Sequence, residues 1–173
     1  MTVAALNYQS ITVTVPCGEQ LHLTRFYKDK KQLGAPVFMM HGLLEDGTAF
    51  YDENGKGLAC YMAQQGYDVY VADLRGKGHS WPAIQANSQV GVHAHITEDI
   101  PALLKKIHSI RGNTPQIWVG HGWGTVLLTA YYARMDTLLA PVAQMLHLGA
   151  RRQTLLASRL KRFVFNTLWR RLG

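Results

Sequence analysis

Alternating apolar and polar residues at the start of the chain predict an antiparallel hairpin. Isoleucine and valine alternate with threonine over residues 11–15, the Pro-Cys-Gly sequence at 16–18 indicates a turn, and a second alternating stretch covers residues 21–26. A continuous apolar run follows at 36–40. Such a run is typical of a strand that is buried on both faces, as in parallel sheets.

Helical and strand patterns alternate beyond this run. We predict helices at about 57–65, 97–110 and 123–134, and strands at 68–72, 116–120 and 142–148. Gly66 marks the end of the first helix, and Thr97 is expected to be the N-cap of the second. Strands that alternate with helices predict an α/β fold, with a doubly wound, mostly parallel sheet that is entered by an antiparallel hairpin.

Charge divides the chain of 173 residues into two parts. Residues 1–150 carry eleven basic and eleven acidic side chains, whereas residues 151–173 carry seven basic side chains and no acid. Apolar residues recur in this last segment at helical spacing. We therefore predict a partial α/β core at 1–150 and a basic amphipathic helix at 151–173. A nucleic-acid partner is not expected, because the core is neutral overall.

The cysteines and the N-terminus bear on location. Cys17 and Cys60 form no CxxC pair, which favours free thiols in a reducing compartment. The N-terminus lacks the basic start and apolar run of a signal peptide, and no stretch approaches the ~20 apolar residues of a membrane span. A cytoplasmic location is expected.

Three short segments carry the candidate chemistry, and each follows a predicted strand. They are His41-Gly42-Leu43-Leu44, the DLRGKGHS loop from Asp73 to Ser80, and Gly120-His121-Gly122-Trp123-Gly124. Open α/β sheets place their sites at the carboxyl ends of the strands. With these motifs in this order, the chain resembles the α/β-hydrolase superfamily, in particular lipase/esterase-like members of the AB hydrolase-1 type with an HG loop, a DLRGxGxS loop and a GHSxGG-type elbow.

The resemblance covers nearly the whole chain and implies an ancestral serine hydrolase that acts on esters or lipids. The nucleophile elbow of such enzymes is a sharp turn from strand to helix, and it needs small residues two positions before and two positions after the nucleophile. Gly120 and Gly124 meet this need. Gly122 occupies the nucleophile position itself, so the catalytic serine is absent.

The resemblance also implies an oxyanion hole made by the backbone N–H groups of Leu43 and Trp123. These groups do not depend on a serine. An enzyme that has lost triad members retains at most about 10³–10⁴-fold acceleration over water from such a hole and from binding.

The triad acid and histidine of the family follow its seventh and eighth strands. We expect strands 1–6 only, with a truncated C-terminal end, so that the triad acid and histidine are absent from this chain. The sixth strand would then have an unpaired edge, which is a liability for aggregation.

Two other motifs are considered and set aside. Gly120-x-Gly122-x-Gly124 lacks the further glycine of a dinucleotide site, because Thr125 stands in its place. His93-Ala94-His95 lies near Glu98 and Asp99, but no third ligand is indicated, and we expect a solvated loop. No metal site and no cofactor are predicted.

The remaining ionisable residues near the three segments are expected to have structural roles. Those expected to face solvent beside the cleft entrance are Glu45, Asp46, Asp52 and Glu53. Those expected to fix their own loop are Asp73 and Arg75. His41 and His121 are expected to pack against neighbouring strands. For His22 and His79 the sequence indicates no partner.

Two hypotheses for function remain. In the first, the chain is a truncated or degenerate hydrolase (a pseudoenzyme or a fragment) with little or no activity. In the second, it is a non-catalytic protein that binds a small apolar ester, acyl or carboxylate ligand in the retained cleft. The open edge of the sixth strand favours the first. For residues 151–172 a role as the first helix of a cap or lid, or in packing, ranks above contact with a membrane surface.

Overall fold

The computed structural model describes residues 6–84, 90–134 and 139–150. Six strands form one sheet in the order β1-β2-β4-β3-β5-β6. The strands are β1 (Asn7–Thr14), β2 (Gln20–Tyr27), β3 (Pro36–Met40), β4 (Asp68–Asp73), β5 (Gln116–His121) and β6 (Val142–Leu148). β1, β2 and β4 pair antiparallel, whereas β4, β3, β5 and β6 pair parallel. The predicted α/β fold with a hairpin entrance is confirmed.

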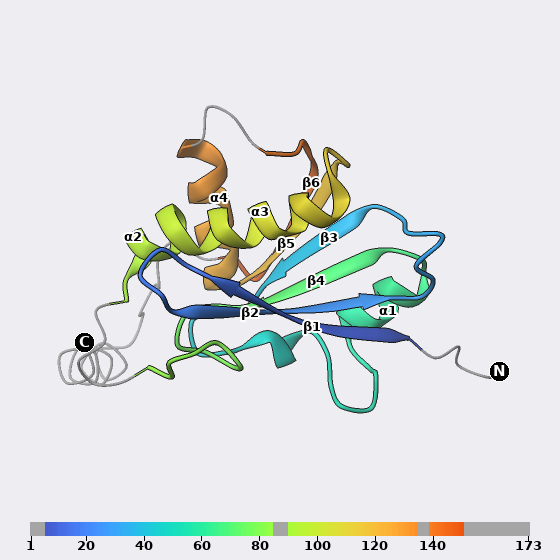
Figure 1. Cartoon of the computed structure of the whole chain (residues 1–173), viewed down its shortest axis with the longest axis horizontal. Coiled ribbons are helices and arrows are strands. Elements are labelled where there is room, and N and C mark those ends of the chain that lie inside the picture. Colours follow the sequence, from blue (N-terminus) through green and yellow to red (C-terminus); the bar gives the residue numbers. More distant parts are fainter. Residues whose placement is uncertain (1–5, 85–89, 135–138, 151–173) are drawn as a thin grey trace, which may run out of the picture.

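Helices cover both faces of this sheet (Figure 1). On one face lie α3 (Ile100–Arg111) and α4 (Trp123–Arg134), and on the other lie the 3₁₀ turn η1 (Gly47–Ala49) and α1 (Leu58–Gln64). The two layers correspond to two separate apolar clusters of buried residues. The sheet therefore has a core on each side, as expected for a doubly wound fold.

The apolar run of β3 explains this arrangement. Phe38 and Met40 belong to the cluster under α3 and α4, whereas Val37 and Met39 belong to the cluster under α1. Successive side chains of a strand point to opposite faces, so a run without polar positions buries both faces. All four side chains are at most 1% exposed, and full burial of such a side chain contributes about 1.5–3 kcal/mol.

The helix predicted at 97–110 begins earlier than expected. A short helix α2 (Val92–Ala94) leads into a wide π turn η2 (His95–Asp99) and then into α3. Thr97 is therefore no N-cap, and its hydroxyl donates to the carbonyl of His93 instead. Pro101 has no N–H with which to continue the regular hydrogen-bond ladder, which accounts for the wide turn just before it.

The His93-Ala94-His95 segment is likewise helical rather than a solvated loop. His95 Nδ1 lies 2.8 Å from Oδ2 of the buried Asp99, one turn further on. The prediction was wrong because the helical pattern before Thr97 is short and weakly apolar, while the partner that stabilises it is an acid within the next turn.

A buried ion cluster anchors the beginning of β4. Asp68 receives two hydrogen bonds from Arg25, at 2.7 and 2.9 Å, and one from Arg111 at 2.6 Å. The hydroxyl of Tyr70 donates to the same carboxylate at 2.8 Å. Burial raises the pKa of Tyr70, with a smaller rise from the adjacent Asp68 carboxylate. The strands β2 and β4 and the helix α3 are thus connected through one acid.

β6 forms one edge of the sheet. It pairs with β5 and with no other strand among the described residues, and its side chains are exposed or half-buried. Residues 151–173, predicted to be a basic helix, lie outside the described residues. Within the described part of the chain, no helix has the length and apolar character needed to cross a membrane.

Candidate functional site

The turn between β5 and α4 has the geometry of a nucleophile elbow. Gly122 adopts φ +50°, in the left-handed region. A Cβ on Gly120 would clash with the backbone of Thr125, and a Cβ on Gly124 would lie 2.6 Å from the carbonyl oxygen of His41. The two outer glycines are therefore required by the close approach of strand and helix. The frame of an elbow is present, although the serine is not.

Within the part of the chain that the structure describes, the space above Gly122 is open. Among those residues, a Cβ placed on Gly122 would meet a single heavy atom within 4 Å, the Cα of Gly42 at 3.9 Å. The N–H of Gly122 donates to the carbonyl of Leu148 at 2.8 Å, which ties the elbow to the end of β6. The backbone thus keeps the conformation in which a nucleophile would be presented, and the room for it.

Two backbone N–H groups belong to residues that directly follow Gly42 and Gly122 in the chain. Leu43 follows Gly42 in the loop after β3, and Trp123 is the first residue of α4. Among the described residues, neither N–H has a hydrogen-bond acceptor. These are the two N–H groups that the sequence predicts for an oxyanion hole, and that role stays a prediction.

His41 has the structural role that the sequence predicts. It is fully buried, its Nδ1 donates to the carbonyl of Gly42 at 2.7 Å, and its Nε2 accepts from the N–H of Leu74 at 3.0 Å. Burial lowers the pKa of His41. The imidazole therefore stays neutral and holds the HG loop against the loop after β4.

His121 and Glu45 form a pair beside the elbow. Nδ1 of His121 lies 2.6 Å from Oε2 of Glu45, and the N–H of Gly42 donates to the same oxygen at 2.9 Å. Partial burial raises the pKa of Glu45, but the hydrogen bonds from His121 and Gly42 outweigh it and hold the pKa below its ordinary value. The expectation that Glu45 simply faces solvent was wrong, because the fold brings His121 to it from 76 positions away.

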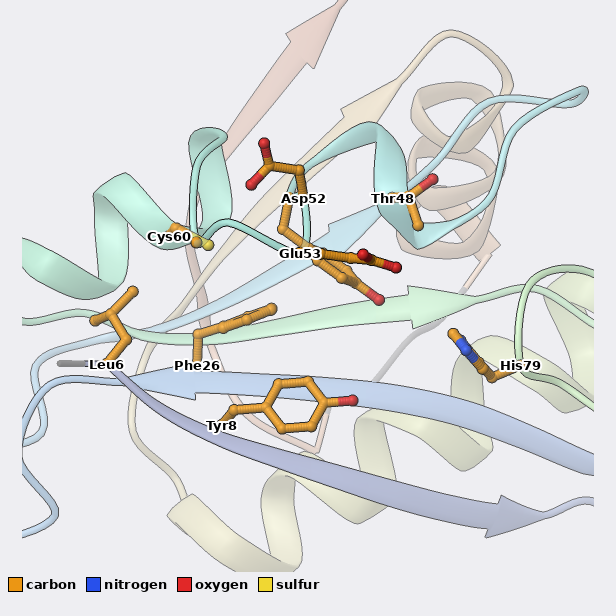
Figure 2. A pocket seen from close by; sticks show the side chains of 10 residues that line it. Leu6, Tyr8, Phe26, Thr48, Asp52, Glu53, Cys60 and His79 are labelled. Atoms are coloured by element: carbon orange, nitrogen blue, oxygen red, sulfur yellow. The ribbon is translucent and has the colours of Figure 1, made fainter.

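The other acids of this loop have separate roles. Asp46 accepts from the N–H of Thr48 at 2.9 Å and caps η1. Asp52 and Glu53 are exposed, as predicted. They lie on the rim of a groove of about 790 Å³, whose apolar wall includes Phe26 and Cys60 (Figure 2).

The loop after β4 is held by its acid. Asp73 accepts from the N–H groups of Gly47 and His79 at 2.7 and 3.0 Å, and Nδ1 of His22 lies 3.0 Å from it. Burial raises the pKa of Asp73, but these hydrogen bonds, that with His22 first, hold it below its ordinary value. Asp73 therefore fixes its own loop, as predicted, and also η1 and β2.

Arg75 connects the same loop to the helical layer. Its guanidinium lies 2.6 Å from Asp99, 2.8 Å from Glu98 and 3.2 Å from Glu19. The prediction that Arg75 fixes only its own loop was too narrow. Its three acidic partners come from η2 and from the hairpin turn, which are distant along the chain.

His22 and His79 were predicted to lack partners, and this was wrong. Both face Asp73, and their ring centroids are 4.9 Å apart. The missed signal is the register of β2 against β4, which places His22 opposite Asp73. This register depends on the strand order, which the sequence alone does not determine.

Comparison with known proteins identifies the relatives of this chain. The sequence profile of a family described as serine aminopeptidase, S33, matches residues 31–171. Triacylglycerol lipase 2 of Arabidopsis thaliana is 27% identical over 128 residues, which cover 65% of this chain and 30% of the lipase. Lipase lipl-3 of Caenorhabditis elegans is 26% identical over 145 residues, which cover 75% of this chain and 35% of that protein.

Solved structures agree on the fold. An esterase from Exiguobacterium antarcticum has a TM-score of 0.62 at 19% identity, covering 82% of this chain and 46% of the esterase. An esterase from Pyrococcus furiosus has a TM-score of 0.62 at 14% identity, covering 84% of this chain and 50% of that one. The chain thus spans about a third of the length of the two lipases and about half the length of the two esterases. By the match over 31–171 and by its fold, the chain belongs to the serine aminopeptidase S33 family of the α/β-hydrolase superfamily.

Proposed function

We propose that this chain descends from serine hydrolases of esters or lipids and does not itself hydrolyse esters through an acyl-enzyme. The observation that carries this proposal is Gly122, which has the φ of an elbow nucleophile and no side chain. Covalent acyl transfer needs a side-chain oxygen or sulfur at this point. What remains is the pair of N–H groups of Leu43 and Trp123, which have no acceptor among the described residues and would leave at most about 10³–10⁴-fold acceleration over water.

Rapid mixing with p-nitrophenyl butyrate tests the proposal. An acyl-enzyme releases p-nitrophenolate in a burst that equals the enzyme concentration. We expect no burst from the wild-type chain. A stoichiometric burst would overturn the proposal, because it would show that another side chain of the molecule acts as the nucleophile.

A second function is favoured by the open space at the elbow. Among the described residues, the N–H groups of Leu43 and Trp123 have no acceptor and the space over Gly122 is open, which supports binding of the carbonyl or carboxylate end of a small acyl ligand. In a serine enzyme the nucleophile would fill part of this space. We infer that such a ligand binds without reacting.

Thermal denaturation with octanoate tests this inference. A ligand that binds only the folded state raises Tm in proportion to ln(1 + [L]/Kd). We expect octanoate to raise the Tm of the wild type and to have a smaller effect on Gly122→Ala, whose methyl group occupies the vacancy. Gly91→Ala is the matched control, because its Cβ would meet no atom of the described residues within 4 Å. No shift in the wild type, or equal shifts in Gly122→Ala and Gly91→Ala, would overturn the inference.

A further inference from the structure

Three potential metal ligands meet at the carboxyl end of β4. His22 comes from β2, Asp73 is the last residue of β4, and His79 comes from the loop beyond it. Nδ1 of His22 lies 3.0 Å from Oδ2 of Asp73, and Nδ1 of His79 lies 3.6 Å from the same oxygen. One ligand atom from each of the three residues lies within 4.8 Å of the others.

These distances fit a zinc site. Zinc binds imidazole nitrogen and carboxylate oxygen at about 2.0–2.2 Å, so two ligands at the tetrahedral angle are about 3.4 Å apart. The distances of 3.0 and 3.6 Å to Oδ2 bracket this value. The ligand atoms are at most 4.8 Å apart, so they must move slightly closer to bind one metal ion. The His79 side chain is 68% exposed, so its ring is free to rotate toward the other two ligands.

The surroundings orient two of the three ligands. Nε2 of His22 lies 2.8 Å from the hydroxyl of Ser10. Zinc binding replaces the hydrogen bond from Nδ1–H of His22 to Asp73 and shifts the ring proton to Nε2, which donates it to Ser10, so that Nδ1 has a lone pair for the metal. Asp73 is held by the N–H groups of Gly47 and His79. Such outer hydrogen bonds fix the tautomer and direction of ligands in known metal sites.

The fourth side of the cluster is accessible. His79 also lines the groove of about 790 Å³ and lies at one end of it, beyond the carboxyl end of β4 (Figure 2). Water or a group of a bound molecule can therefore complete the coordination. Three protein ligands with one open position is the arrangement of zinc sites that bind an exchangeable fourth ligand.

We propose that His22, Asp73 and His79 form a binding site for one Zn²⁺ ion at the end of this groove. His22 and His79 coordinate through Nδ1, and Asp73 through Oδ2. The site is separate from the elbow and does not depend on the function proposed for Gly122. Its ligands lie 51 and 6 residues apart along the chain, which is why no ligand motif is visible in the sequence.

Titration calorimetry with ZnCl₂ tests this proposal, with the full chain first stripped by EDTA. We expect one Zn²⁺ per wild-type chain and at least tenfold weaker binding by His79→Ala. His93→Ala is the matched control, because His93 is also exposed but lies in α2 outside the cluster. Failure of the wild type to bind at micromolar free zinc, or equal affinities of the two variants, would overturn the proposal.

Cobalt substitution gives a second readout. Tetrahedral Co²⁺ absorbs in the visible range, and we expect this absorption in the wild type and in His93→Ala but not in His79→Ala. The exposed position of His79 lets its variant fold without zinc, and equal circular dichroism of the metal-free proteins checks this. Visible bands of equal strength in His79→Ala would place the metal elsewhere.

Discussion

Glu45 and His121 form a hydrogen bond of 2.6 Å directly beside the elbow, across 76 positions of the chain. The same carboxylate oxygen accepts from the N–H of Gly42 in the HG loop. The pair therefore connects two of the three segments that define the site. It also occupies Nδ1 of His121, the residue directly before Gly122.

The Glu45–His121 pair has a predictable pH dependence. Since its pKa is depressed in the folded state, Glu45 stabilises the protein above its ordinary pKa, and this contribution is lost as pH falls through the lower folded value. We expect Glu45→Gln to lower the free energy of unfolding, measured by urea denaturation at pH 7, by roughly 0.5 kcal/mol for such a half-exposed pair. This difference from the wild type should vanish in acid below the folded pKa of Glu45. Glu53→Gln, at an exposed position, is expected to change neither the free energy of unfolding at pH 7 nor its dependence on pH. A deficit that grows in acid would refute the role given to Glu45.

The buried Asp68 is expected to be a major determinant of stability. Asp68→Ala leaves the guanidinium groups of Arg25 and Arg111 without their buried partner. Removing one member of a buried ion cluster costs about 3–5 kcal/mol. Chemical denaturation should show this loss in Asp68→Ala and almost none in Glu53→Ala. A loss below about 1 kcal/mol would mean that water replaces the carboxylate easily.

The outer glycines of the elbow make a second stability prediction. Gly124→Ala forces a Cβ against the carbonyl oxygens of Met40 and His41. We expect a loss of about 1–3 kcal/mol or more, since α4 must move away from β3. Gly91→Ala should be close to neutral, because no atom of the described residues lies within 4 Å of its Cβ. Equal melting temperatures for the two variants would show that the elbow tolerates a wider turn.

Restoring the serine separates the nucleophile from the base. Gly122→Ser has room for its side chain and costs about 1–2 kcal/mol for the left-handed backbone. We expect no restored hydrolysis of short aryl esters, because both ring nitrogens of His41 are hydrogen-bonded, and because His121 is directed to Glu45 with its Nε2 near Gly149 at the end of β6. Turnover in Gly122→Ser that disappears in the double variant with His121→Ala would show that His121 serves as the base.

Most of the fold follows from the sequence, because apolar runs such as Val37–Met40 need two covered faces whatever lies around them. The elbow was equally predictable from Gly120 and Gly124, whose positions follow from close backbone approach. The Glu45–His121 pair and the Asp73 cluster were not, since they depend on which strands become neighbours. The same holds for the early helix at Val92. The cytoplasmic location and the cap helix at 151–173 stay predictions.

The steady-state rate of p-nitrophenyl butyrate hydrolysis by the wild-type chain tests the central claim most directly. Without a nucleophile at Gly122, we expect a rate no more than about 10³–10⁴ times that of water and independent of serine-directed inhibitors. Typical enzymes reach a kcat of about 1–10³ s⁻¹. Saturable turnover in that range, abolished by a serine-directed inhibitor, would contradict the claim that this chain does not hydrolyse esters through an acyl-enzyme.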